Sequence, residues 1–129
     1  MSLDPDLREL AQGTNFAALS TLTADGRPRT HVMWIDADDE HLIVNTDRSR
    51  AKFADVERDP RVTVTVIDQA NPYRYIEVRG RVVETVTGAP AAEHIDRLSQ
   101  RYSDKPYWGD TDNRVIVKIA PEKLHKNGF

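Results

Sequence analysis

The chain has 129 residues, of which 39% are hydrophobic and 30% are charged, and it contains no cysteine. This composition is typical of one globular domain, and the lack of cysteine excludes disulfides, thiolate catalysis and cysteine-ligated metals. The formal net charge of -3 excludes a general nucleic-acid or anionic-membrane binder, so local basic clusters stand out as candidate sites.

Neither a metal site nor a targeting segment is predicted. The four histidines, His31, His41, His94 and His125, are scattered and form no pair at metal-binding spacing. Residues 1–4 are not cationic and precede no apolar run, and no apolar window approaches the length of a membrane span. We therefore expect a cytoplasmic protein without metal, nucleic-acid or membrane partners.

The first part of the chain predicts a short helix and three strands. Asp4-Pro5 is suited to cap and open a helix over residues 4–12, which Gly13 ends. Asp25-Gly26 between two apolar runs is a strong hairpin signal. The predicted strands span Phe16–Leu22, Arg29–Ile35 and His41–Thr46.

The second part predicts three further strands and two helices. Val62, Val64 and Val66 share one face of a β-branched strand. Gly80 in the middle of another strand indicates a bulge or a sharp bend. The predicted strands span Arg61–Asp68, Tyr73–Thr87 and Asn113–Pro121, and the predicted helices span Ser49–Asp59 and Gly88–Tyr102.

Six strands joined mostly by short links, with two helical crossings, predict a mainly β fold, an antiparallel barrel with short flanking helices. The barrel is expected over residues 16–121 of a single domain that spans residues 1–129. Residues 122–129 are expected to form a basic C-terminal tail.

The segment from Asn45 to Lys52 opens the second predicted helix and combines cations, hydroxyls and one acid: Arg48, Arg50, Lys52, Thr46, Ser49 and Asp47. A helix N-terminus carries partial positive charge and favours acids, so three cations there are in conflict with the helix dipole. Free N–H donors, hydroxyls and a guanidinium suit a phosphate. The residues alone leave two interpretations open, a phosphate site or a solvated charged helix start. In either case, Thr46, Asp47 or Ser49 is expected to cap the helix.

With these elements in this order, the chain resembles the pyridoxamine 5'-phosphate oxidase-like split-barrel flavoproteins, and among them the branch that uses the deazaflavin coenzyme F420. The resemblance covers Phe16 to Lys123. It rests on the order and spacing of Phe16–Leu22, Asp25–Pro28, Val32–Trp34, Thr46–Lys52, Arg58–Val62 and Pro72–Gly80.

The resemblance implies a six-stranded antiparallel split β-barrel that forms a homodimer, with cofactor sites at the subunit interface. It implies an oxidoreductase that transfers a hydride between bound F420 and a small unsaturated organic substrate. Lys52 matches the family's phosphate-binding lysine. The cofactor-binding residues implied are Thr46, Arg48, Ser49, Arg50 and Lys52 around the phosphate, and His31, Met33 and Trp34 along the ring.

Several alternatives stay open. An FMN-dependent oxidase or reductase, or a non-catalytic flavin or F420 carrier, fits the same scaffold. The chain lacks the extended C-terminal portion of the pyridoxamine-phosphate oxidases proper, so oxidation of that substrate is not predicted. His31 is a candidate proton donor or an ordinary strand histidine, and no other catalytic residue is named. Met33 and Trp34 alternatively fill the core or an interface. Tyr107 and Trp108 lie in a polar loop as a pocket rim or as anchors of the loop.

Overall fold

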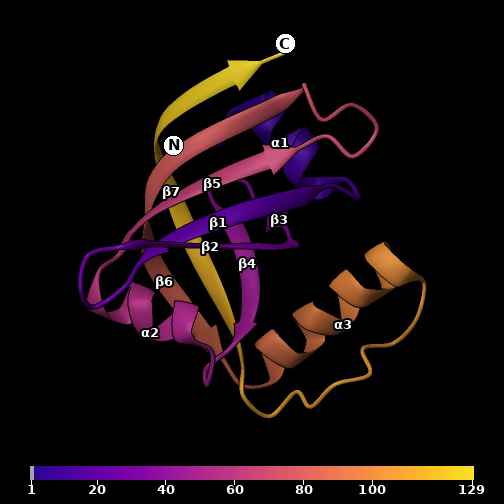
Figure 1. Cartoon of the computed structure of the whole chain (residues 1–129). Coiled ribbons are helices and arrows are strands. Elements are labelled where there is room, and N and C mark those ends of the chain that lie inside the picture. The colour runs from indigo at the N-terminus through magenta and orange to yellow at the C-terminus, as the bar shows by residue number, and fades with distance from the viewer. Residues whose placement is uncertain (1) are drawn as a thin grey trace.

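The computed structural model describes residues 2–129, and in this part of the chain seven antiparallel strands and three helices are formed (Figure 1). The strands are β1 (Phe16–Leu22), β2 (Pro28–Trp34), β3 (Asp36–Ala37), β4 (Leu42–Asp47), β5 (Arg61–Ile67), β6 (Tyr75–Thr87) and β7 (Arg114–Asn127). The helices are α1 (Pro5–Gln12), α2 (Ala51–Arg58) and α3 (Ala89–Ser103).

The strand order lets the sheet curl into a split barrel. The order is β2-β1-β5-β6-β7-β4-β3, so β2 and β3 lie at its two ends. Only Ile35 separates these two strands in the chain, and this brings the ends of the sheet together. In Figure 1, α1 lies behind the upper part of the sheet, whereas α2 and α3 lie on either side of its lower part.

Alternation along the strands determines which side chains form the core. In β5, Val62, Val64 and Val66 are buried while their neighbours are not, as the sequence predicted. Leu7 of α1 joins the same core. The predicted cap of α1 is also confirmed, because the Asp4 carboxylate accepts a hydrogen bond from the Leu7 backbone N–H at 3.1 Å.

Strand β4 is buried on both faces. Val44 faces the barrel core, whereas Ile43 packs outside it in a small cluster with Ala91 of α3 and Ile116 of β7. Asn45 is buried as well, and its side-chain nitrogen donates to the Ala91 carbonyl at 3.0 Å. Helix α3 therefore seals the outer face of β4 and covers a polar side chain there.

The predicted bend at Gly80 is confirmed. The register between β6 and β7 shifts between Arg79 and Gly80, where Gly80 pairs with Pro121. A Cβ atom on Gly80 would stand 2.4 Å from the Ala120 carbonyl oxygen. Only glycine lets the two backbones approach this closely.

The mainly β split barrel is confirmed, but two details of the prediction are wrong. A seventh strand, β3, forms at Asp36 and Ala37, between two predicted strands where no strand was expected. Strand β7 continues past Pro121 to Asn127, where a basic tail was expected, because residues 123–127 pair with residues 75–79 of β6. Proline is tolerated beside a bulge, so Pro121 does not end the strand. No helix within residues 2–129 has the length and apolar character needed to cross a bilayer.

Candidate functional site

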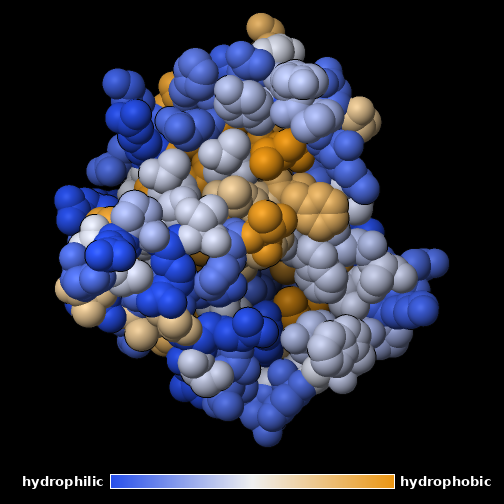
Figure 2. All heavy atoms as spheres, in the orientation of Figure 1, coloured by the Kyte–Doolittle hydropathy of each residue, from blue (hydrophilic) through white to orange (hydrophobic). Residues whose placement is uncertain are grey.

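A cavity of about 340 Å³ opens between β2, the end of β4, α3 and the loop before β7. Its apolar wall consists of Phe16, Val32, Met33, Trp34, Ile95 and Leu98. Its polar wall consists of Asn45, Thr46, Arg50, Lys52, Tyr107 and Arg114. Figure 2 shows a hollow in this region, below an apolar patch in the middle of the view.

Three cations meet on the polar wall of this cavity. Arg50 and Lys52 stand at the start of α2, and Arg114 is the first residue of β7. The β4–β7 register places Arg114 opposite Asp47, which brings it to the same corner. Desolvation lowers the pKa of Lys52, and the charges of Arg50 and Arg114 lower it further. Cations that destabilise one another in this way favour a bound anion.

Arg114 is held by neutral acceptors. Its Nε donates to the side-chain oxygen of Asn45 at 2.9 Å, and Nη2 donates to the Asn45 carbonyl at 3.2 Å. Its Nη1 donates to the Tyr107 hydroxyl at 3.4 Å, and the guanidinium lies 5.3 Å from the centre of that ring. Among residues 2–129, neither Arg50 nor Lys52 forms a side-chain ion pair. The charge of the Asp47 carboxylate acts on Arg50 and Arg114, but three cations outnumber this one acid, so the corner keeps a net positive charge.

Five of the eight predicted site residues line the cavity: Thr46, Arg50, Lys52, Met33 and Trp34. The other three lie outside its lining. Arg48 donates to the Asn113 side-chain oxygen at 3.2 Å on the surface. Ser49 donates its backbone N–H and its hydroxyl to the Asp47 carboxylate, at 2.8 and 2.6 Å. His31 is exposed on β2.

The start of α2 differs from the prediction. The helix begins at Ala51 with Arg50 as its N-cap residue, and no side chain accepts a hydrogen bond there. The expected cap by Thr46, Asp47 or Ser49 is wrong, because the Asp47 carboxylate closes the preceding turn with Ser49 instead. The first turn of α2 thus has no side-chain acceptor, which is a favourable environment for an anion.

His31 is poorly suited to act as an acid. Desolvation lowers its pKa, and the positive charges of Lys52 and Arg29 lower it further. The imidazole is therefore neutral near pH 7.

Trp34 has one face already occupied. Its ring stacks on Tyr102 of α3, with ring centroids 5.0 Å apart and an angle of 9° between the planes. The Tyr102 hydroxyl accepts from the Ile35 backbone N–H at 3.1 Å, which fixes α3 against the end of β2. A planar ligand in the cavity would meet Trp34 from the side that Tyr102 leaves open.

Sequence reasoning did not identify six further side chains that line the cavity: Asn45, Arg114, Phe16, Val32, Ile95 and Leu98. Arg114 opens an apolar strand, and a charged residue at that place is a weak signal by itself. The suggestion that Tyr107 forms part of a pocket is confirmed, whereas Trp108 is 90% exposed and stacks on Tyr107 with centroids 5.8 Å apart.

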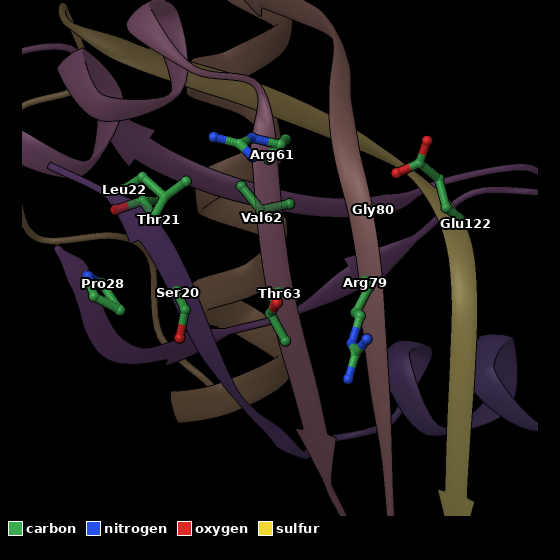
Figure 3. A pocket seen from close by; sticks show the side chains of 10 residues that line it. All are labelled: Ser20, Thr21, Leu22, Pro28, Arg61, Val62, Thr63, Arg79, Gly80 and Glu122. Carbon is green, nitrogen blue, oxygen red and sulfur yellow. The ribbon is translucent and has the colours of Figure 1, made fainter. Parts of the chain in front are cut away.

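A second hollow, of about 330 Å³, lies over β1, β5 and β6 (Figure 3). Ser20, Thr63 and Arg79 lie side by side there, because Ser20 pairs with Thr63 and Thr63 pairs with Arg79. Arg61 at its edge is paired with Asp59 at 2.7 Å. This hollow lacks the convergent cations of the first, which remains the candidate site.

The fold and this cavity define a class of protein. The chain matches the pyridoxamine 5'-phosphate oxidase family over residues 3–128, and it belongs to that family. No curated protein matches the chain.

Solved structures of similar shape agree with this assignment. An F420 reductase is 32% identical, with a TM-score of 0.81, over 92% of this chain and 94% of that protein. A conserved hypothetical protein from Mycobacterium tuberculosis is 22% identical, with a TM-score of 0.77, over 98% of this chain and 85% of the other. A heme storage protein from Vibrio cholerae is 20% identical, with a TM-score of 0.69, over 100% and 97%. The last two share the fold.

Proposed function

We propose that this protein is an oxidoreductase that binds the deazaflavin coenzyme F420 in the cavity and acts on a small unsaturated organic substrate. The observation that carries the proposal is the convergence of Arg50, Lys52 and Arg114 on one wall of a cavity whose other wall is apolar. A phosphate and a flat ring are the two chemical groups that such a pair of walls suits. The 32% identity to an F420 reductase supports this choice of cofactor.

The residues of the cavity divide by role. Lys52, Arg50 and Arg114 would hold the phosphate by charge-assisted hydrogen bonds, and the hydroxyl of Thr46 is a further donor. Met33 and the open side of Trp34 would lie along the ring, so that the chain orients two flat molecules and excludes water between them. When bound, the deazaflavin supplies the hydride chemistry itself.

FMN is the second candidate for the same residues. It also ends in a phosphate, so the three cations accommodate either coenzyme. The polyanionic tail of F420 offers additional partners for the cations of this corner, and this favours F420. A non-catalytic carrier would bind the coenzyme through the same contacts. It would differ from the enzyme only in that no electron acceptor oxidises the bound coenzyme.

We also propose that a second copy of the chain completes the site. The outward side of β1, β2 and β5 bears an apolar patch, visible in Figure 2, which register assigns to Phe16, Ala18, Val32 and Ile67. Val32 is 70% exposed there. An exposed apolar sheet face is typical of a subunit interface. Because Phe16 and Val32 also line the cavity, a partner on this face would border the bound cofactor.

Fluorescence titration with F420 and with FMN tests the proposal. We expect saturable binding of F420, tighter than that of FMN, followed by oxidation of reduced F420 in the presence of a panel of unsaturated acceptors. A purified protein with a flavin absorption spectrum would favour FMN. Binding of reduced F420 without turnover by any acceptor would favour the carrier, and binding of neither coenzyme would refute the proposal.

A further inference from the structure

A chain of hydrogen bonds links β3 to the cavity through buried side chains. The Asp36 carboxylate accepts from Nη2 of Arg101 at 2.8 Å and contacts Nε2 of His94 at 2.9 Å. Nδ1 of His94 lies 3.0 Å from Nδ2 of Asn45, and the Asn45 oxygen accepts from Nε of Arg114 at 2.9 Å. The exposed fractions of His94 and Asn45 are 3% and 6%.

Asp36 fixes the direction of these bonds. Burial alone would raise the pKa of Asp36, but the hydrogen bonds with His94 and Arg101 outweigh it and lower the pKa to about 2. The carboxylate is therefore ionised and can only accept hydrogen bonds. It follows that Nε2 of His94 carries a proton, and Nδ1, which faces the amide nitrogen of Asn45, serves as the acceptor.

The amide of Asn45 then has one favourable orientation. Its nitrogen donates to Nδ1 of His94 and to the Ala91 carbonyl, both at 3.0 Å, and this leaves its oxygen for Arg114. A flipped amide would place its oxygen against the Ala91 carbonyl and its N–H groups against Nε of Arg114. Both contacts would be repulsive, so Ala91 and His94 on one side of Asn45 and Arg114 on the other all favour the same orientation of its amide.

We propose that His94 and Asn45 are positioning residues that hold Arg114 in the geometry needed to bind the cofactor phosphate. His94 is not among the residues that line the cavity, so it acts only through Asn45. A guanidinium has five N–H donors, and Arg114 uses three of them on Asn45 and Tyr107, which leaves two for a ligand. Because the Asn45 side chain is uncharged, it fixes Arg114 without neutralising its positive charge. An acidic side chain at this position would cancel that charge. The inference rests on the proposed function, because it assigns a role at the same site.

Two matched variants of His94 isolate the contact with Asn45. His94→Asn places an oxygen near the position of Nδ1, whereas His94→Leu has the same branching without an acceptor. Both lose the hydrogen bond to Asp36, so they share that cost in stability. We expect His94→Asn to bind F420 and FMN within about twofold of the wild type, and His94→Leu to bind about threefold to tenfold more weakly.

Asn45→Asp tests the same chain with an almost isosteric change. The new carboxylate would pair with Arg114 and cancel its charge, so binding of both coenzymes should weaken by more than about tenfold. If His94→Leu does not fold, as judged by thermal unfolding, Asn45→Asp still tests the part of the inference that concerns Asn45.

The inference is overturned if His94→Leu binds as tightly as His94→Asn, or if Asn45→Asp binds like the wild type. If the wild type binds and Lys52→Ala weakens binding while these variants do not, only the positioning role fails. If the wild type binds neither coenzyme, the proposed function fails and this inference fails with it.

Discussion

Lys52 and Arg114 face the same cavity from α2 and β7, and the charge of Arg114 acts on the Lys52 ammonium. Desolvation is the first cause of the lowered pKa of Lys52, and repulsion by Arg50 and Arg114 adds to it. The folded protein without a ligand therefore holds these cations together at a cost. A bound anion removes the cost, and this couples ligand binding to stability.

Lys52→Met should stabilise the protein in the absence of ligand. The folded-state pKa of Lys52 lies below its unfolded value, so the unfolded chain binds the proton more tightly. The resulting loss of stability is fully present below both pKa values, as at neutral pH, and disappears as the pH rises through the interval between them. Methionine keeps the length of the stem without the charge. We expect a melting temperature higher by about 2–5 °C in phosphate-free buffer.

Lys105→Met, at an exposed position before β7, provides the control and should melt like the wild type. A lower melting temperature for Lys52→Met would show that the ammonium stabilises the empty site, and the repulsion inferred among the three cations would then be wrong.

Asp36 should make a large contribution to stability against acid. Its folded-state pKa is about 2, below the unfolded value, so its contribution is present above about pH 4 and is lost as the pH falls toward 2. The contribution amounts to about 2 kcal/mol at neutral pH. Urea unfolding of the wild type and Asp36→Asn measures it, and the difference between them should shrink from pH 6 to pH 2.5. A difference that stays constant over this range would contradict the assignment.

Gly80→Ala should destabilise the barrel. The added Cβ would stand 2.4 Å from the Ala120 carbonyl oxygen, so β6 and β7 would have to separate at the bend. We expect the free energy of unfolding to fall by about 1–3 kcal/mol in a denaturant titration. Val83→Ala on the same strand, where the side chain is 50% exposed, should change it by about 0.5 kcal/mol or less. Equal stabilities for the two variants would rule out the close approach.

Ala18→Glu should disrupt the proposed dimer. Ala18 lies in the apolar patch between Val32 and Thr65, and it does not line the cavity. A carboxylate buried there without a partner opposes association. Sedimentation should show a dimer for the wild type and for Ala70→Glu, which is exposed in the β5–β6 turn, and a monomer for Ala18→Glu. A monomeric wild type at micromolar concentration would contradict the interface.

Most of the strands were predictable because burial follows a period of two along them. Val62, Val64 and Val66 are buried as the alternation indicated, and the glycine signal at Gly80 located the bend. The predicted last strand ended at Pro121, because proline normally opposes pairing. In the structure, β7 continues beyond it, since Pro121 lies beside a bulge that accommodates it. The short strand β3 has too few residues to produce a pattern.

The sequence predicted the site only where its residues lie close together in the chain. Arg50 and Lys52 are close to Thr46 in the sequence, and all three line the cavity. Arg114 reaches the same cavity through the register of β4 with β7, and register is set by packing across the sheet. No sequence signal marked Asn45 as a residue that positions another side chain. Its partner His94 lies on a helix that only the tertiary fold places over β4.

The most direct test of the central claim is a fluorescence titration of the wild type, Lys52→Ala and Arg48→Ala with F420 and FMN. Lys52 lines the cavity, whereas the Arg48 side chain is bonded to Asn113 outside it. We expect Lys52→Ala to lose about 1.5–3 kcal/mol of binding free energy to the better ligand, as for a lost charge-assisted hydrogen bond, and Arg48→Ala to lose about 0.5 kcal/mol or less. Unchanged affinity of a folded Lys52→Ala protein would contradict the claim that this cationic corner binds the cofactor phosphate.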